Sequence, residues 1–403
     1  MDRRDFGRAL IGTAGAGVAA AVTESGHAAQ GVPSRDAAYR VFPDLPVRRN
    51  DKIRTGGDYH EVVGTQGFTS KQSLNYFRRF NARYLTAAAR DTGVVKAPNP
   101  LVKGGGAELT AEGPWDLDQL KRMQDDCQNA GMILECIRMS SAYIIMKPGP
   151  DRDRYLDIIR DNIRKAHQAG ATLISHHWTM IPIRRNFNAP GRGGSTYVGF
   201  KLEPNYKSLP VNPASGRVSA EDYWSRIDYF LKGVIPTCKE YNIKLAAHPY
   251  DPGGMPLGYM GVDNWDAGDY AAALKKYVML YDDPANGLTY DCGVAAESLP
   301  DPSTEINIMR WLAERKKINQ VHFRNVRGHL DDFLEVYEDE GDAPMFNCLK
   351  VLRDTGWEGT LLPDHNPVNP DDPHKLQAYA FSYGYIEGLL RAAKEEAIRA
   401  TRA

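Results

Sequence analysis

Short apolar segments alternate with longer amphipathic segments along most of the chain. In the amphipathic segments apolar residues recur every three or four positions, as one buried helix face requires, and the clearest cover Leu156–Ala166, Trp224–Cys238 and Leu376–Ala393. The short segments are rich in apolar or β-branched residues and predict strands. The predicted strands are Glu61–Gly64, Arg83–Ala88, Met132–Ile137, Thr172–His177, Lys244–His248, Gly287–Asp291, Gln320–Phe323 and Gly359–Pro363.

Eight strands, each followed by a helix, predict an α/β protein with the (β/α)8 TIM-barrel fold. An open doubly wound sheet is the alternative, but no GxGxxG motif follows the first strand. Two long segments, residues 92–115 and 184–219, interrupt the alternation and contain glycine next to other small residues. Neither ends in the GK[ST] of a phosphate-binding loop, so we interpret both as extended loops over the C-terminal face of the barrel.

The amino-terminal segment has a different character from the rest. Arg3 and Arg4 precede a weakly apolar, Ala- and Gly-rich stretch over residues 9–22, followed by small residues at 28 and 29. This order resembles a twin-arginine export signal and predicts a periplasmic or extracellular protein. We therefore divide the chain into a signal at 1–30, a linker or arm at 31–58, and a catalytic barrel at 59–403.

Composition narrows the function classes. The 50 basic and 51 acidic residues give a formal net charge of −1, which argues against nucleic acid as a partner. No apolar run is long enough for a membrane-spanning helix. Five scattered cysteines without a CxxC pair exclude a disulfide scaffold and a zinc ribbon.

Metal-binding residue types gather where the predicted strands end. Five of the ten histidines lie at such ends, and in a barrel these ends meet at one mouth. Four successive strands end near a histidine, a cysteine, a histidine and an aspartate, which we predict to share one divalent cation. Two imidazoles, a thiolate and a carboxylate suit Zn²⁺, Mn²⁺, Fe²⁺ or Co²⁺ better than Ca²⁺. The predicted ligands are His248, Cys292, His322 and Asp364.

The segments around these four residues resemble the mannonate dehydratase family in order and approximate spacing. The segments are His248-Pro249-Tyr250-Asp251-Pro252, Cys292-Gly293, His322-Phe323-Arg324-Asn325-Val326 and Pro363-Asp364-His365. The resemblance spans roughly residues 60–395 and implies a metal-dependent (β/α)8 barrel that dehydrates D-mannonate to 2-keto-3-deoxygluconate, usually with Mn²⁺ or Fe²⁺. It implies the same four ligands. Tyr250 departs from the family pattern, which has an acid there.

Dehydration of a sugar acid needs a base for the α-proton and an acid for the departing β-hydroxyl. The resemblance implies an acid–base tyrosine after the last ligand, and Tyr379 is the nearest one. His365 and His177, each at a strand end, are further candidates. Arg324 is predicted to hold the substrate carboxylate, with Asn325 and Tyr250 as additional substrate contacts.

Two other functions stay open at this point. Metal-assisted enolisation would equally serve a sugar isomerase or epimerase of the xylose-isomerase-like class, although a cysteine ligand favours the dehydratase. An exported barrel that binds a sugar acid without converting it is the second alternative. In each case the predicted partner is a small sugar acid or sugar, and homo-oligomerisation is left open.

Overall fold

The computed structural model describes residues 52–58, 67–89, 113–139, 142–212, 215–372 and 374–402. The chain divides into two compact units, residues 1–38 and 39–403, and every described residue belongs to the second. The predicted export signal, most of the predicted arm, the predicted strand Glu61–Gly64 and most of the loop at 92–115 lie outside the described residues. None of the helices in the described residues has the length and apolar character that a membrane span requires.

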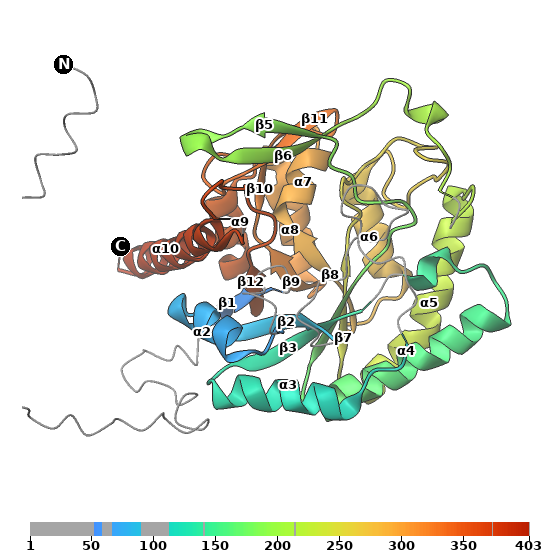
Figure 1. Ribbon diagram of the computed structural model, residues 1–403, viewed down its shortest axis with the longest axis horizontal. Helices are drawn as coiled ribbons and strands as arrows, with labels where there is room; N and C mark the ends of the chain where they lie inside the picture. The colour runs from blue at the N-terminus through green and yellow to red at the C-terminus, as the bar shows by residue number, and fades with distance from the viewer. Residues whose placement is uncertain are drawn as a thin grey trace, which may run out of the picture. The chain divides into compact units, whose positions relative to one another are not determined.

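The described strands close into a barrel of eight parallel strands, which confirms the predicted fold (Figure 1). Around the barrel the order is β1-β12-β9-β8-β7-β4-β3-β2. Their bounds are β1 Ile53–Gly57, β2 Tyr84–Ala88, β3 Ile133–Arg138, β4 Leu173–His177, β7 Lys244–His248, β8 Asn286–Asp291, β9 Ile318–His322 and β12 Gly359–Leu362. Because neighbouring strands are parallel, all their carboxyl ends lie at one rim.

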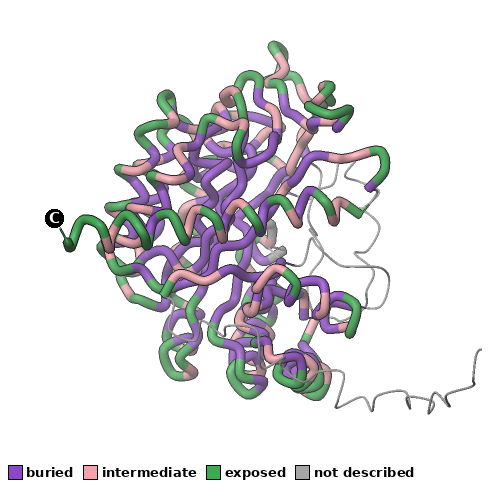
Figure 2. Tube along the Cα trace, turned by 90° about the vertical axis from the view of Figure 1, so that its left-hand side faces the viewer, coloured by how far each residue is buried: buried purple, intermediate pink, exposed green. Residues whose placement is uncertain are grey.

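Helices surround the barrel, and in Figure 2 the buried trace runs through the middle of the fold. The long helices bury one face, whereas six of the seven residues of α7 (Cys292–Ser298) are buried. Several helices begin at a side-chain cap: Asp116, Ser219 and Asp269 each accept a hydrogen bond from a backbone N–H of the first turn. The helices are α2 Lys71–Arg79, α3 Leu117–Asn129, α4 Pro150–Gln168, α5 Ala220–Glu240, α6 Tyr270–Leu280, α7 Cys292–Ser298, α8 Glu305–Glu314, α9 Met345–Asp354 and α10 Leu376–Ala400.

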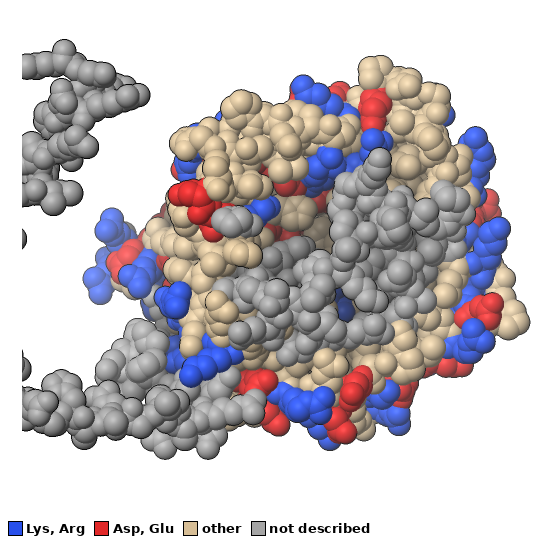
Figure 3. Space-filling view, in the orientation of Figure 1, with Lys and Arg blue, Asp and Glu red and all other residues tan. Residues whose placement is uncertain are grey.

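Charged side chains on the outer helices form pairs along one helix. On α4, Arg160 Nη1 lies 2.6 Å from Asp157 Oδ1, and Lys165 Nζ lies 2.8 Å from Asp161 Oδ2. On the visible described surface in Figure 3, basic and acidic atoms are intermixed along the edge that carries α3 and α4. Such exposed pairs contribute little to stability, about 0.5 kcal/mol each.

The first strand of the barrel differs from the prediction. The barrel includes Ile53–Gly57, which falls within the segment predicted as a linker or arm. Its sequence, Ile-Arg-Thr-Gly-Gly, carries little apolar signal. The two glycines are needed because a Cβ at Gly56 would lie 2.4 Å from Thr360 Cγ2, and one at Gly57 would lie 2.5 Å from the Phe77 ring.

A second, four-stranded antiparallel sheet stands beside the barrel, in the order β10-β11-β6-β5 (Figure 1). Its strands are β5 Phe187–Pro190, β6 Thr196–Lys201, β10 Asn325–His329 and β11 Asp332–Val336. The segment 184–219, predicted as an irregular loop, therefore contributes a hairpin. The hairpin is held by buried residues on β6, Tyr197 and Phe200, and by pairing of β6 with β11.

Candidate metal centre

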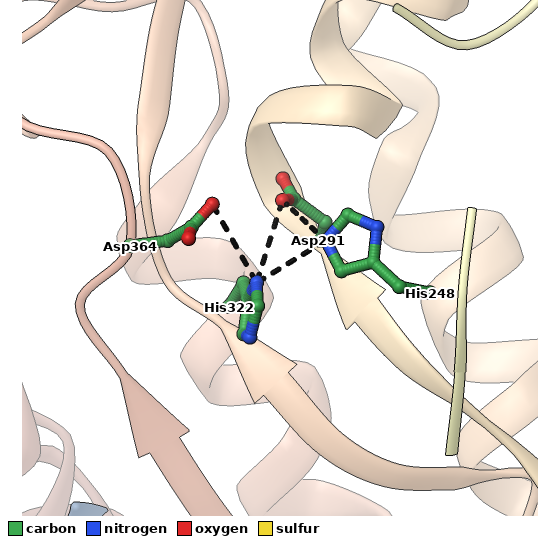
Figure 4. Close-up of side chains that lie close together, drawn as sticks. All are labelled: His248, Asp291, His322 and Asp364. Carbon is green, nitrogen blue, oxygen red and sulfur yellow. Dashed lines mark hydrogen bonds and ion pairs between the residues drawn. The ribbon is translucent and has the colours of Figure 1, made fainter. Parts of the chain in front are cut away.

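Four buried side chains meet at the carboxyl-terminal rim of the barrel (Figure 4). His248, Asp291 and His322 are the last residues of β7, β8 and β9, and Asp364 follows β12 by two residues. One donor atom from each lies within 4.8 Å of the others. The convergence follows from the topology, since these four strands are neighbours in the barrel.

Two nitrogens and two carboxylate oxygens face a common point. His248 Nε2 lies 3.2 Å from Asp291 Oδ2 and 3.2 Å from His322 Nδ1. His322 Nδ1 lies 3.5 Å from Asp364 Oδ2 and 3.8 Å from Asp291 Oδ2. Two imidazoles with two carboxylates are a donor set used for Mn²⁺, Fe²⁺, Zn²⁺ and Co²⁺.

The outer nitrogens of both histidines orient the rings for metal binding. His248 Nδ1 lies 2.7 Å from the carbonyl oxygen of Pro249, which requires a proton on Nδ1 and leaves the lone pair on Nε2. His322 Nε2 lies 3.8 Å from Asp58 Oδ2, just after β1. Metal-bound histidines usually have such a carbonyl or carboxylate behind the ring, so the residues present fit a divalent cation.

The structure brings together three of the four predicted ligands and separates Cys292 from them. The Cys292 sulfur lies in a different buried group, with Glu305 and Cys348, and Asp291 takes its place at the rim. Asp291 ends β8 whereas Cys292 begins α7, and consecutive residues at such a junction point in different directions. Every residue of β8 is buried, so no polar–apolar alternation in the sequence indicates which side chain faces the barrel mouth.

Arg324 neutralises much of the negative charge at the rim. Its Nε donates to Asp291 Oδ2 at 2.9 Å and lies 3.1 Å from Asp364 Oδ2. Burial alone would raise the pKa of Asp291, but Arg324 and His248 lower that pKa to about 2. Burial alone would lower the pKa of His322, but Asp364, Asp58 and Asp291 together raise it to about 9.

A chain of alternating charges leads from Arg324 to the second sheet. Arg324 Nη2 lies 3.1 Å from Asp251 Oδ2, and Arg185 Nη2 lies 2.7 Å from both oxygens of Asp251. Arg185 Nε also donates to Glu335 Oε1 at 2.8 Å. Glu335, on β11, binds His365 Nδ1. His365 Nε2 lies 3.8 Å from Asp364 Oδ2, which closes the chain of contacts at the metal centre.

The three predicted acid–base residues all contact this centre, in different ways. His177 stacks on His248 with ring centroids 4.3 Å apart, and its buried Nδ1 has no hydrogen-bond partner among the described residues. His365 is the most accessible, with 27% of its side chain exposed. The Tyr379 hydroxyl donates to the backbone carbonyl of Asp364 at 2.8 Å, so it fixes the segment that carries a ligand.

The three predicted substrate contacts have polar atoms engaged within the protein. The Arg324 side chain is 1% exposed and binds the carboxylates described above. Asn325 Oδ1 accepts from the N–H groups of Val326 and Ala343, each at 2.9 Å. The Tyr250 hydroxyl donates to the Pro182 carbonyl at 2.8 Å. Their contact with a substrate stays a prediction.

Sequence reasoning gave no role to Asp58, Asp251, Arg185 or Glu335, although all four belong to the site. Asp251 follows His248 in the motif HPYDP, and that proximity is a usable signal. Arg185 and Glu335 are 150 residues apart in sequence. Pairing of β6 with β11 brings their segments together.

Comparison with known proteins confirms the predicted resemblance. Residues 213–399, which include all four rim residues, match the family model described as D-mannonate dehydratase (UxuA). The chain is 28% identical over 313 residues to a mannonate dehydratase of Streptococcus equi subsp. zooepidemicus, covering 69% of this chain and 83% of that one. It is 27% identical over 321 residues to one of Enterococcus faecalis, covering 70% and 87%.

Solved structures agree on the fold. The crystal structure of mannonate dehydratase from Streptococcus suis serotype 2 superposes with a TM-score of 0.67 at 22% identity, covering 86% of this chain and 96% of that one. A xylose isomerase domain protein from Alicyclobacillus acidocaldarius gives a TM-score of 0.53 at 14% identity, covering 85% and 99%. At these identities the superpositions establish the barrel, while the sequence matches establish the family resemblance.

Proposed function

We propose that this chain, a divergent relative of the mannonate dehydratases, is a metal-dependent hydro-lyase that removes water from a sugar acid such as D-mannonate. One observation carries the proposal. The residues that match the dehydratase family contain four buried donors that converge at the barrel mouth, each from its own strand end. A chain of charged groups surrounds those donors and reaches an accessible histidine.

His248, Asp291, His322 and Asp364 would hold the cation, with Mn²⁺ or Fe²⁺ favoured by the family resemblance and Zn²⁺ or Co²⁺ compatible with the donor set. The cation supplies Lewis acidity, which stabilises the negative charge that develops on the substrate when its α-proton leaves.

His365 is the residue best placed to exchange a proton with the substrate. Glu335 binds its Nδ1, so the ring orientation is fixed and Nε2 is the nitrogen left for proton transfer. His177 stacks on the ring of His248 and offers a second ring nitrogen, Nδ1. The site then has two groups, His365 and His177, for the two proton transfers of a dehydration. We assign Tyr379 as a positioning residue because its hydroxyl binds the Asp364 carbonyl.

Arg324 would position the two carboxylate ligands, Asp291 and Asp364, rather than bind the substrate first. Its contacts with Asp291 and Asp364 hold both carboxylates at the rim and offset their mutual repulsion. Of its nitrogens, Nη1 alone lacks a hydrogen-bond partner among the described residues, and that nitrogen points toward Gly293. Arg324 would therefore hold the ligand carboxylates, and Nη1 is the nitrogen left for a further partner.

The test is to incubate the metal-loaded protein with a panel of aldonic and uronic acids and to analyse products by mass spectrometry. Loss of one water with a 2-keto-3-deoxy product supports the proposal, and in D₂O the product should carry deuterium at C3. A product of unchanged mass would indicate an isomerase or epimerase instead. Saturable binding without conversion would indicate a binding protein. The Asp291→Asn variant, purified alongside, controls for a contaminating dehydratase.

We also propose export by the twin-arginine route, on the basis of Arg3 and Arg4 and the small-residue segment that follows them. A folded, metal-loaded barrel is the kind of cargo that this route carries. The combined substitutions Arg3→Lys and Arg4→Lys should leave the protein in the cytoplasmic fraction, while the unchanged chain reaches the periplasm. Equal distribution of both proteins would contradict the proposal.

A further inference from the structure

A second group of potential metal ligands, separate from the rim group, lies among the helices α7, α8 and α9. Cys292 is the first residue of α7, Glu305 the first residue of α8, and Cys348 lies within α9. Both sulfurs and a carboxylate oxygen lie within 4.8 Å of one another. All three residues are 0% exposed. Three helices thus each contribute one donor to a single enclosed point.

The carboxyl group of Glu305 has only weak partners. Among the described residues no N–H or O–H group donates to its oxygens, and its side-chain hydrogen bonds are with the thiols of Cys292 and Cys348. The buried hydroxyls of Tyr270 and Tyr290 have no hydrogen-bond partner among the described residues. A buried carboxyl group whose partners are weakly hydrogen-bonding thiols costs free energy, and a cation held by the same three side chains would offset that cost.

We propose that Cys292, Glu305 and Cys348 bind a second divalent cation, a structural Zn²⁺ that joins α7, α8 and α9. Two thiolates with a carboxylate form a donor set that favours zinc over the hard cations. Two sulfurs on one zinc, each about 2.3 Å from the metal, stand about 3.8 Å apart in a tetrahedral site. The present separations therefore allow a zinc ion with only small rotations of the side chains.

A disulfide between Cys292 and Cys348 is the competing use of the two thiols. It would leave Glu305 buried without a partner, whereas a cation satisfies all three residues at once. The two uses make opposite predictions for Glu305. Replacing its carboxylate should release a zinc ion but should have no effect on the formation of a disulfide.

The first experiment measures metal stoichiometry of the full-length protein by plasma mass spectrometry. We expect two ions per chain, one of them zinc. Glu305→Gln and Cys348→Ala should each lose the zinc and keep the other ion, and His248→Ala should do the reverse. Cys238→Ala, which removes a buried thiol from α5, is the matched control and should keep both ions. One ion per chain in the wild type, unchanged by Glu305→Gln, would overturn the proposal.

A spectroscopic measurement on the wild type decides the matter even if a variant fails to fold. Zinc-edge X-ray absorption should show two sulfur neighbours at about 2.3 Å. Cobalt substitution should produce thiolate-to-cobalt absorption in the wild type and in His248→Ala but not in Cys348→Ala. A thiolate signal lost in His248→Ala but retained in Cys348→Ala would assign Cys292 to the rim and overturn the proposal. A titration that finds Cys292 and Cys348 oxidised to a disulfide would overturn it as well.

This test is independent of the proposed hydro-lyase activity. Zinc bound among α7, α8 and α9 in a protein that converts no sugar acid would support the second site while refuting the enzyme. An active dehydratase with one ion per chain would do the opposite.

Discussion

The adjacent residues Asp291 and Cys292 belong to two different groups of potential metal ligands, and the surroundings of the two groups differ. Asp291 joins the rim group, in which the ligands have further partners such as Arg324, Asp58 and the Pro249 carbonyl. Cys292 joins the group enclosed by α7, α8 and α9, in which the hydrogen bonds of Glu305 are with the two thiols of the same group. Reactive metal sites need oriented ligands beside an open position, whereas structural zinc sites are closed. Under our two proposals the rim group would carry the chemistry, and the enclosed group would stabilise the packing of α7, α8 and α9.

The largest effect on turnover should come from substituting Asp291, compared with its neighbour Cys292. Asp291→Asn removes a ligand charge and should lower turnover by about 10³-fold, equivalent to about 4 kcal/mol of transition-state stabilisation. Cys292→Ala should reduce turnover less than about tenfold. Product formation and metal content are measured together for both variants. The opposite ranking would restore Cys292 as the rim ligand.

Glu335→Gln tests whether the second sheet supports the chemistry at the rim. Loss of the carboxylate that binds His365 Nδ1 should lower kcat by about 10–100-fold, the usual cost of removing a group that orients a site residue. Asp332→Asn is the matched control on the same strand, since its ion pair with Lys201 is exposed. If both variants lose activity equally, the sheet matters for folding and not for orientation.

Gly293→Ala probes the space between the two groups. The new Cβ would lie 2.8 Å from Arg324 Nη1 and 2.9 Å from its Cζ, so Arg324 must shift. We expect a loss of about 1–3 kcal/mol in the free energy of unfolding, measured in urea, with weaker metal binding at the rim. Gly388→Ala is the control: no atom lies within 4 Å of its added Cβ, and helix propensity should stabilise α10 by about 0.5–1 kcal/mol. Unchanged metal affinity in Gly293→Ala would show that Arg324 does not orient the ligands.

The smallest effect concerns Asp266, a buried carboxyl group with one oxygen that has no hydrogen-bond partner among the described residues. Burial raises the pKa of Asp266 to about 7, from 3.8 in a model peptide. Between these values the folded chain keeps a proton that the unfolded chain has lost, so stability falls as pH rises from about 4 to about 7. Asp266→Asn should therefore stabilise the protein by about 1 kcal/mol or more at pH 8 and have little effect at pH 4. Equal effects at both pH values, measured by urea unfolding, would refute the shifted pKa.

The barrel strands could be predicted where side chains dominate their packing. Lys244–His248 is predicted with the bounds that the structure shows, since its apolar residues lie between a charged start and a histidine end. The strand Ile53–Gly57 could not be, because its glycines are there to admit Thr360 and Phe77 from elsewhere in the chain. The hairpin of β5 and β6 could not be predicted for a similar reason, because its stability depends on the pairing of β6 with β11.

The sequence by itself determined the alternation of strands and helices, which predicts a barrel. It also placed histidines, carboxylates and one cysteine at or beside the ends of consecutive strands, which predicts a divalent-cation site at the barrel mouth. The tertiary structure decided which neighbour of the Asp291–Cys292 pair faces that mouth, and it joined Arg185, Glu335 and His365 into one network. The physical reason is that composition and periodicity indicate which residues are buried, whereas the direction in which a buried side chain points depends on strand register. In a strand buried on both faces, a one-residue difference in register exchanges the ligand for its neighbour.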